Sequence, residues 1–178
     1  IFANSIFNLL FLGLLFLVLI VQIFMPGFVS IIAPGFVEDV DKMNIVINLT
    51  RITFPFLLFI SIASFFAAIL NSHDKFAVAA AAPIILNVIL IIVLFFSNSL
   101  GDELVYYLSY GVSLAGILQL LFLYKFVRKF VSLKFNFKIR VNKKVKTFFK
   151  KLLPSIFSSG VTQINILVGT IIASFQAS

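Results

Sequence analysis

The side chains that most often carry enzyme chemistry are scarce in this sequence, and none lies within an apolar segment. The chain has one histidine, His73, no cysteine, and six acidic residues that all fall in polar segments between apolar runs. Acid–base catalysis and metal binding both need several ionisable or ligating groups held close together. We therefore expect no enzyme, no metal site and no cofactor, and interpret His73 and Asp74 as a solvated turn.

The chemistry available inside the apolar segments is hydrogen bonding by neutral side chains and by backbone freed at prolines. Ser, Asn and Gln can hydrogen-bond between membrane helices. A proline leaves a carbonyl one turn earlier without its N–H partner, and such breaks are common in transporters. For the neutral candidates, the alternative role is helix packing. For the arginine, the alternative is that its side chain simply extends to the lipid headgroups. The residues that we single out as transport-related are Arg51, Pro55, Pro83, Asn87, Gln163 and Asn165.

The composition predicts that these residues lie in a protein that crosses a membrane several times. The chain is 62% hydrophobic and 11% charged, with a mean hydropathy of +1.19. A helix of roughly 20 apolar residues crosses a hydrocarbon layer of about 30 Å. We therefore expect an all-α, polytopic helical membrane protein with five transmembrane helices. They are predicted at 2–24, 52–70, 76–96, 104–126 and from 152 onward.

Turn signals separate the predicted spans. Pro-Gly pairs follow Met25 and Ala33, and an acidic, amphipathic connection at 38–41 precedes the second span, so Arg51 is expected at the outer end of that span. The first apolar run is longer than the core of a signal peptide and has no basic segment before it. We expect the chain to begin inside a larger protein.

Positive charge is concentrated in one stretch. Residues 124–151 contain eleven of the 14 lysines and arginines and no acidic residue. Loops rich in Lys and Arg stay on the cytoplasmic side of the membrane. Alternation of the spans then places residue 1 and the His73 turn inside, and residues 38–41, 102–103 and 178 outside.

The basic stretch has two patterns. Apolar and polar residues alternate over 133–141, which predicts an extended segment, and from Asn142 apolar residues recur at helical spacing. The second pattern is typical of a basic helix lying on a membrane. We expect contact with anionic phospholipids; charges that only fix topology are the alternative, and nucleic acid is not expected. The lysines of this helix are Lys143, Lys144, Lys146, Lys150 and Lys151.

Several ordered motifs make the chain resemble a known family along essentially its full length. They are Ala33-Pro34-Gly35-Phe36, Leu49-Thr50-Arg51-Ile52-Thr53-Phe54-Pro55, Ile69-Leu70-Asn71-Ser72, Ala82-Pro83, Leu86-Asn87, Gly116-Ile117-Leu118-Gln119-Leu120, Leu153-Pro154, Gln163-Ile164-Asn165 and Ala173-Ser174-Phe175. In this order they resemble the MurJ (MviN) family, the lipid II flippases of peptidoglycan synthesis.

The resemblance implies a bacterial inner-membrane transporter with fourteen helices, of the MOP superfamily and MATE-like, of which this chain would be helices three to seven. Residues 1–126 would belong to the N-terminal lobe, 127–151 would be the cytoplasmic amphipathic linker, and 152–178 the first helix of the C-terminal lobe. Residue 178 would then be periplasmic. Substrate-binding arginines would lie mainly on helices outside this chain, and Gly169 stands where many relatives carry an acidic residue linked to cation coupling.

The resemblance also implies the function. The chain would be part of a flippase that moves the lipid-linked peptidoglycan precursor, lipid II, by alternating access and without covalent chemistry, together with the remaining helices of the same transporter. A polysaccharide-unit or multidrug exporter of the same superfamily is the first alternative, and a non-transporting membrane scaffold is the second.

Overall fold

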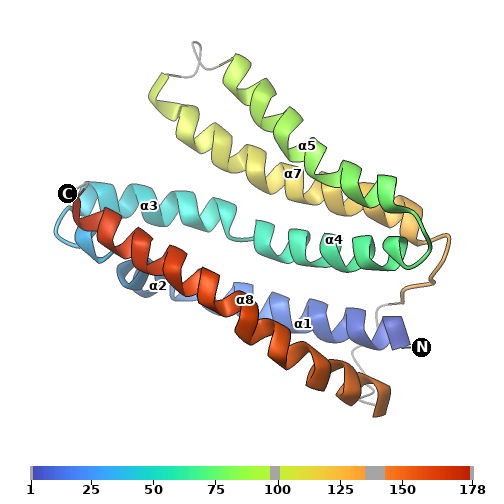
Figure 1. Ribbon diagram of the computed structural model, residues 1–178. Coiled ribbons are helices and arrows are strands. Elements are labelled where there is room, and N and C mark those ends of the chain that lie inside the picture. Colours follow the sequence, from blue (N-terminus) through green and yellow to red (C-terminus); the bar gives the residue numbers. More distant parts are fainter. Residues whose placement is uncertain (1, 97–100, 135–142, 177–178) are drawn as a thin grey trace.

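The computed structural model describes residues 2–96, 101–134 and 143–176, and within these ranges it contains helices and no strand (Figure 1). The α-helices are α1 Phe2–Ile23, α2 Met25–Ile32, α3 Val40–Thr53, α4 Phe56–Asn71, α5 Phe76–Phe95, α7 Leu104–Val127 and α8 Lys143–Gln176. Two short 3-10 turns, η1 Pro34–Phe36 and η2 Gly101–Glu103, precede α3 and α7. The predicted all-α class is confirmed.

Four helical segments of the described chain are long and apolar enough to cross a membrane, and a bent α8 makes a fifth if its two parts are one span. The predicted first, third and fourth spans match α1, α5 and α7 to within a residue or two at each end. Continuous apolar runs between Pro-Gly or polar turns explain this agreement, because each run has the length that one crossing needs. The chain is therefore a polytopic membrane protein.

The second predicted span was placed too late in the sequence. Helix begins at Val40, and α3 and α4 together form a segment of 32 residues with a break at residues 54 and 55. Asp39 starts it: its carboxylate accepts a hydrogen bond from the Lys42 backbone N–H at 3.0 Å, which lowers the pKa of Asp39. An N-cap of this kind satisfies an unpaired donor of the first helical turn, so the acidic connection is the start of a helix.

The main apolar core lies where α1, α4, α5 and α7 meet. Phe7 of α1, Phe66 and Leu70 of α4, and Leu123 and Val127 of α7 are all buried in one cluster. The rings of Phe7 and Phe66 stack with centroids 5.9 Å apart. Helix α7 packs against both α4 and α5, and α4 also contacts α5, so these three helices pack together beside α1 (Figure 1).

A glycine permits the close approach of α7 to α4. A Cβ added at Gly116 would lie 2.7 Å from Cδ2 of Phe56 and 3.1 Å from Cβ of Phe59. Small residues allow such contacts between membrane helices. The glycine at 169 in α8, in contrast, has no atom within 4 Å of its would-be Cβ.

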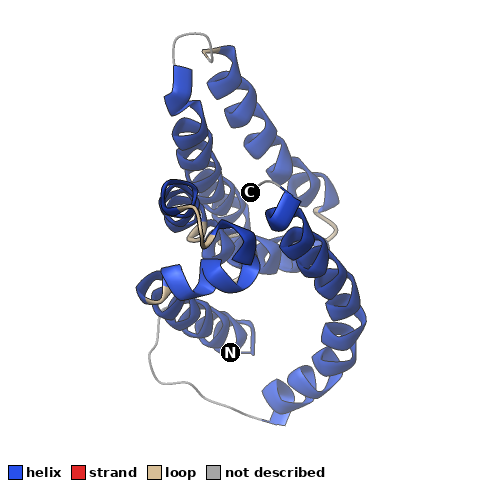
Figure 2. Ribbon diagram, turned by 90° about the vertical axis from the view of Figure 1, so that its left-hand side faces the viewer, coloured by secondary structure: helices blue, strands red, loops and turns tan. Residues whose placement is uncertain are grey.

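Helix α8 touches the rest of the chain mainly at its two ends. Val145 is buried at the start, where the rings of Phe2 and Phe148 also meet with centroids 6.1 Å apart. Near the other end, the backbone N–H of Gly35 donates to Oγ of Ser174 at 3.1 Å. Residues 161–170 between these contacts are all exposed, and Figure 2 shows the helix arching away from α1.

One helix carries both the lysine cluster and the fifth span. Helix α8 runs without interruption from Lys143 to Gln176, across the expected boundary between residues 151 and 152, and it bends by 46° between Val145–Ile156 and Ser159–Gln176. Most of the segment expected to be extended, residues 133–141, lies outside the described residues, and so does Asn142, the expected start of the basic helix. Leu133, at its start, packs against the main core.

Candidate functional site at the break between α3 and α4

The described residues contain no group of three or more His, Cys, Asp or Glu side chains that could hold a metal ion. His73 is exposed, and its ring stacks on that of Phe130 with centroids 4.5 Å apart. Asp74 beside it has a positive φ of 59°, which fits a tight turn. The polar chemistry of the membrane-spanning part is therefore found in neutral side chains and backbone.

At the break between α3 and α4, two backbone carbonyls have no hydrogen-bond donor from their own helix. Pro55 has no N–H, so it cannot donate to the carbonyl of Arg51 one turn earlier. The backbone hydrogen bonds around the break shift instead to shorter steps, with the N–H groups of Leu57 and Leu58 donating to the carbonyls of Phe54 and Pro55 at 3.0 Å each. The carbonyls of Arg51 and Ile52 are left to find donors elsewhere.

Two side chains from other helices supply those donors. Nε2 of Gln22, on α1, donates to the carbonyl oxygen of Arg51 at 2.8 Å. Oγ of Ser113, on α7, donates to the carbonyl oxygen of Ile52. In a membrane, irregular backbone persists where neighbouring helices satisfy its polar groups. The break is thus held by hydrogen bonds from both of the helices that flank it.

Two further contacts, one within α3 and one between α2 and residue 54, stabilise the α3–α4 break. Oγ1 of Thr53 donates back to the carbonyl of Leu49 at 2.9 Å within α3. The rings of Phe28 and Phe54 meet edge to face with centroids 5.4 Å apart. The break is consequently a packed feature of the fold, formed by α1, α2, α3, α4 and α7.

Arg51 lies in the last turn of α3, 11 residues after the start of the helical segment Val40–Asn71. Its side chain is exposed, and within the described part of the chain its guanidinium forms no ion pair. Arg51 is 20 residues from Asn71, or roughly 30 Å at about 1.5 Å per residue, which is close to one hydrocarbon thickness. That distance is compatible with a guanidinium at the headgroup level.

Pro83 and Asn87 lie one helical turn apart on α5, and both are exposed. Pro83 also lines a cavity of about 110 Å³ between α4, α5 and α7, with Gln119 of α7 on its wall. The sequence placed Pro83 near the start of a span, and it is accommodated inside α5. The structure does not bring this pair into contact with the break at Pro55.

Gln163 and Asn165 are exposed on the middle of α8. They do not meet Arg51, Pro55, Pro83 or Asn87. The six transport-related candidates therefore form three separate groups: the α3–α4 break, the exposed face of α5 and the middle of α8.

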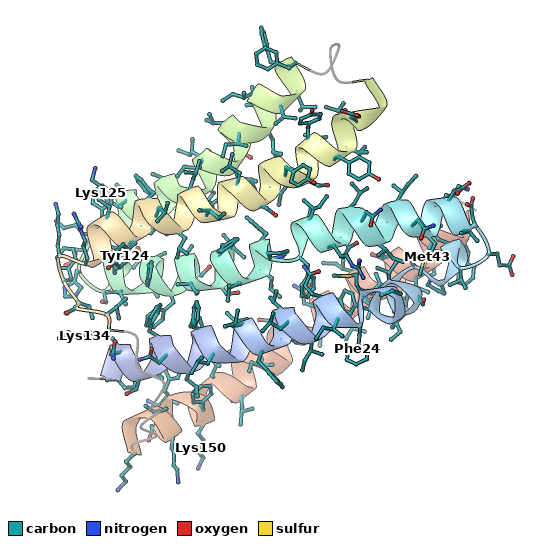
Figure 3. All side chains as sticks on the ribbon, turned by 180° about the vertical axis from the view of Figure 1, so that it is seen from behind. Phe24, Met43, Tyr124, Lys125, Lys134 and Lys150 are labelled. Atoms are coloured by element: carbon teal, nitrogen blue, oxygen red, sulfur yellow. The ribbon has the colours of Figure 1, made fainter. Side chains whose placement is uncertain are left out.

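Lys150, near the start of α8, lies at the same end of the molecule as Lys125 and Lys134 (Figure 3). Lys143, Thr147 and Lys151, spaced four residues apart, line a groove of about 600 Å³ with the rings of Phe2 and Phe148. Lys146 and Lys150 are exposed outside that lining. The acidic N-terminus of α3, near the labelled Met43, lies at the opposite end.

Gln22 was not identified from the sequence as a functional candidate. It is the only Asn, Gln, Ser, Thr or charged residue between Asn8 and Met25, and that isolation in an apolar run was an available signal. The hydrogen-bond partner of Gln22 could not be predicted from the sequence, because that partner is a backbone carbonyl and every residue has one.

Comparison with known proteins gives a consistent family assignment. The family model described as "Lipid II flippase MurJ" matches residues 1–178. A protein of Rickettsia prowazekii (strain Madrid E) named "Probable lipid II flippase MurJ" is 38% identical, over 98% of this chain and 34% of its own length. Proteins with the same name from Rhizobium tropici and Rhizobium meliloti (strain 1021) are 36% and 38% identical, over 97% of this chain and 33% of theirs. The chain thus spans about one third of the length of the curated relatives that it matches.

Proposed function

The chain belongs to the lipid II flippase MurJ family, and from this premise we propose that it is part of a transporter that moves lipid II across the bacterial inner membrane. The match of the family model to all of residues 1–178 is the observation that carries the proposal. The mechanism we propose is alternating access without covalent chemistry. The remaining helices of the same transporter would complete the cavity that holds the substrate.

The proposed arrangement places residues 1–126 in the N-terminal lobe, 127–151 in a cytoplasmic linker and 152–178 in the first helix of the C-terminal lobe. The exposed middle of α8, which contacts the other helices at its ends, supports a separate role for that helix. The basic end of the molecule would face the cytoplasm, with residue 1, and residue 178 would face the periplasm.

The α3–α4 break has a specific role in this proposal. Alternating access requires helices that change direction without leaving backbone groups unpaired in lipid. At Pro55 the two freed carbonyls are held by Gln22 and Ser113, which can adjust through side-chain rotation when α4 tilts relative to α3. We propose that the break is a hinge of the N-terminal lobe, and that Arg51 and Pro55 affect transport through it.

The lysines of α8 have a separate proposed role, in lipid binding. The groove between Phe2 and the face formed by Lys143, Thr147 and Lys151 combines two cationic side chains with apolar rings. Anionic headgroups of the cytoplasmic leaflet are attracted to such clusters, by about 1 kcal/mol for each Lys or Arg near the surface. We propose that anionic phospholipids bind there and hold the start of α8 at the membrane.

Complementation tests the proposed function. The complete reading frame that contains this chain is expressed in cells depleted of their own lipid II flippase, and the membrane abundance of the protein is measured. We expect survival and lipid II on the outer face of the membrane. Lysis of cells that hold normal amounts of the protein would contradict the proposal, and restored export of a different polysaccharide unit would favour the exporter alternative. The 178 residues expressed alone are expected not to rescue growth.

A further inference from the structure

We propose that the cavity between α4, α5 and α7 is a binding site for ordered water, held by Gln119 and by a backbone carbonyl that Pro83 leaves without its usual N–H donor. The cavity measures about 110 Å³, and its lining includes Ser64 of α4, Ala79 and Pro83 of α5, and Gln119 and Leu123 of α7. The inference concerns the packing of the lobe and does not depend on the proposed transport function.

The first observation is an unpartnered donor. Gln119 is 1% exposed, and its Nε2 has no hydrogen-bond partner among the described residues. A buried amide without a hydrogen-bond partner destabilises the fold. If the oxygen and nitrogen of the amide were exchanged, an oxygen would occupy the same unpartnered position. Water satisfies either orientation, because it both donates and accepts.

The second observation is an acceptor on the facing helix. Ala79 lines the same cavity, and its carbonyl lacks the usual donor because the residue four positions later is Pro83. Ser64 offers a third polar atom: its hydroxyl donates to the carbonyl of Ile60 at 2.8 Å, and its oxygen can still accept. Three different helices thus each contribute a lining residue that carries a polar group able to bond water.

The size and chemistry of the cavity select the ligand. A water molecule occupies about 30 Å³ in the liquid and, when buried, typically makes about three hydrogen bonds. The cavity has room for a few such molecules and supplies three polar partners. No carboxylate lines it, whereas hard cations take about six oxygen ligands. A neutral hydrogen-bonding ligand, water, is therefore the class that fits.

X-ray radiolysis of the complete protein in lipid nanodiscs tests the site, because hydroxyl radicals formed from bound water oxidise the side chains beside it. Leu123 and Leu70 form a matched pair: they are 1% and 0% exposed, and only Leu123 lines the cavity. We expect Leu123 to be oxidised several-fold faster than Leu70. Equal, background rates for the two leucines would overturn the proposal.

Two variants test the two polar partners separately. Gln119→Leu keeps a side chain of similar size and removes its polar atoms, and Pro83→Ala restores an N–H to the Ala79 carbonyl. Each is expected to lower the oxidation of Leu123 toward the Leu70 rate. Ser109→Ala is the control, because Ser109 is buried on the same helix, bonds its own helix at Val105, and lies outside the cavity. Unchanged oxidation of Leu123 in both variants would contradict the assignment.

Discussion

Gln22 and Arg51 are 29 residues apart in the sequence, and the side-chain amide of the first donates to the backbone carbonyl of the second at 2.8 Å. The contact joins α1 to the helix break at Pro55 at the point where the proline removes the normal donor. The role of Gln22 is therefore defined by a missing backbone N–H and not by the arginine side chain.

A double-mutant cycle tests this relationship. Gln22→Met removes the donor with little change in side-chain length, and we expect it to lower the free energy of unfolding by about 1 kcal/mol, as for other hydrogen bonds between membrane helices. In the background of Pro55→Ala, where residue 55 has an N–H for the same carbonyl, the cost should largely disappear. Equal losses in both backgrounds, measured by SDS titration of the complete protein, would contradict the pairing.

The hydroxyl of Ser113 should matter more than that of Ser109, although both are on α7. Ser113 donates across to the carbonyl of Ile52, whereas Ser109 donates to the carbonyl of Val105 within its own helix. We expect Ser113→Ala to cost about 1 kcal/mol and Ser109→Ala to be close to neutral, because a hydroxyl bonded within its own helix adds little. Thermal unfolding of the two variants compares them directly. Equal melting temperatures would contradict the claim that the Ser113 hydroxyl stabilises the α3–α4 break.

Gly35 should tolerate no side chain. A Cβ at this position would clash with the backbone carbon and oxygen of Ser174, and backbone cannot move aside as a flexible side chain can. We expect Gly35→Ala to separate the end of α8 from η1. Ser174 is 3% exposed, so a cysteine placed there in a cysteine-free complete protein should react slowly with a thiol reagent, and much faster once Gly35 is changed.

Gly27→Ala is the control for that experiment, since a Cβ at Gly27 has no atom within 4 Å. It should leave the labelling rate of the cysteine at 174 unchanged. If both glycine variants gave the same rate as the parent, the close contact between η1 and α8 would be refuted.

Membrane orientation gives a further prediction. Lys143 and Glu103 are both exposed, and the charge distribution predicts that they lie on opposite sides of the membrane. Single cysteines at the two positions are treated in intact cells with a thiol reagent that does not cross the inner membrane. We expect labelling at 103 and none at 143; the reverse pattern would invert the proposed topology.

The sequence was a good guide to the spans and a poor guide to the breaks within them. Apolar length alone located α1, α5 and α7, because lipid requires a continuous hydrogen-bonded helix of a given length. It failed at α3, whose many polar residues lower the apolar signal although Asp39 caps a stable helix start. It also could not show that the lysine helix and the fifth span are one helix.

The candidate site was predicted only in part. Arg51 and Pro55 were identified from their types, and both lie at the α3–α4 break. Their actual partners, Gln22 and Ser113, depend on which helices pack side by side, and such partners cannot be read from the local sequence. Likewise, the buried state of Gln119 follows from the meeting of α4, α5 and α7 at one cavity.

A second functional prediction concerns the hinge itself. Pro55→Ala should slow lipid II transport by the complete protein while its amount in the membrane stays normal, because a continuous helix resists the bend that we propose. Asn87→Ala, Gln163→Ala and Asn165→Ala are compared in the same assay. A loss of activity that in every case follows a loss of folded protein would make these residues structural.

The most direct test of the account is lipid II translocation by the purified complete transporter in proteoliposomes. Labelled lipid II is incorporated, and its arrival in the opposite leaflet is followed by an enzyme that cannot cross the membrane. We predict translocation well above that of protein-free liposomes, reduced by Pro55→Ala. Movement of lipid II no faster than in protein-free liposomes, with correctly folded protein present, would contradict the proposed function.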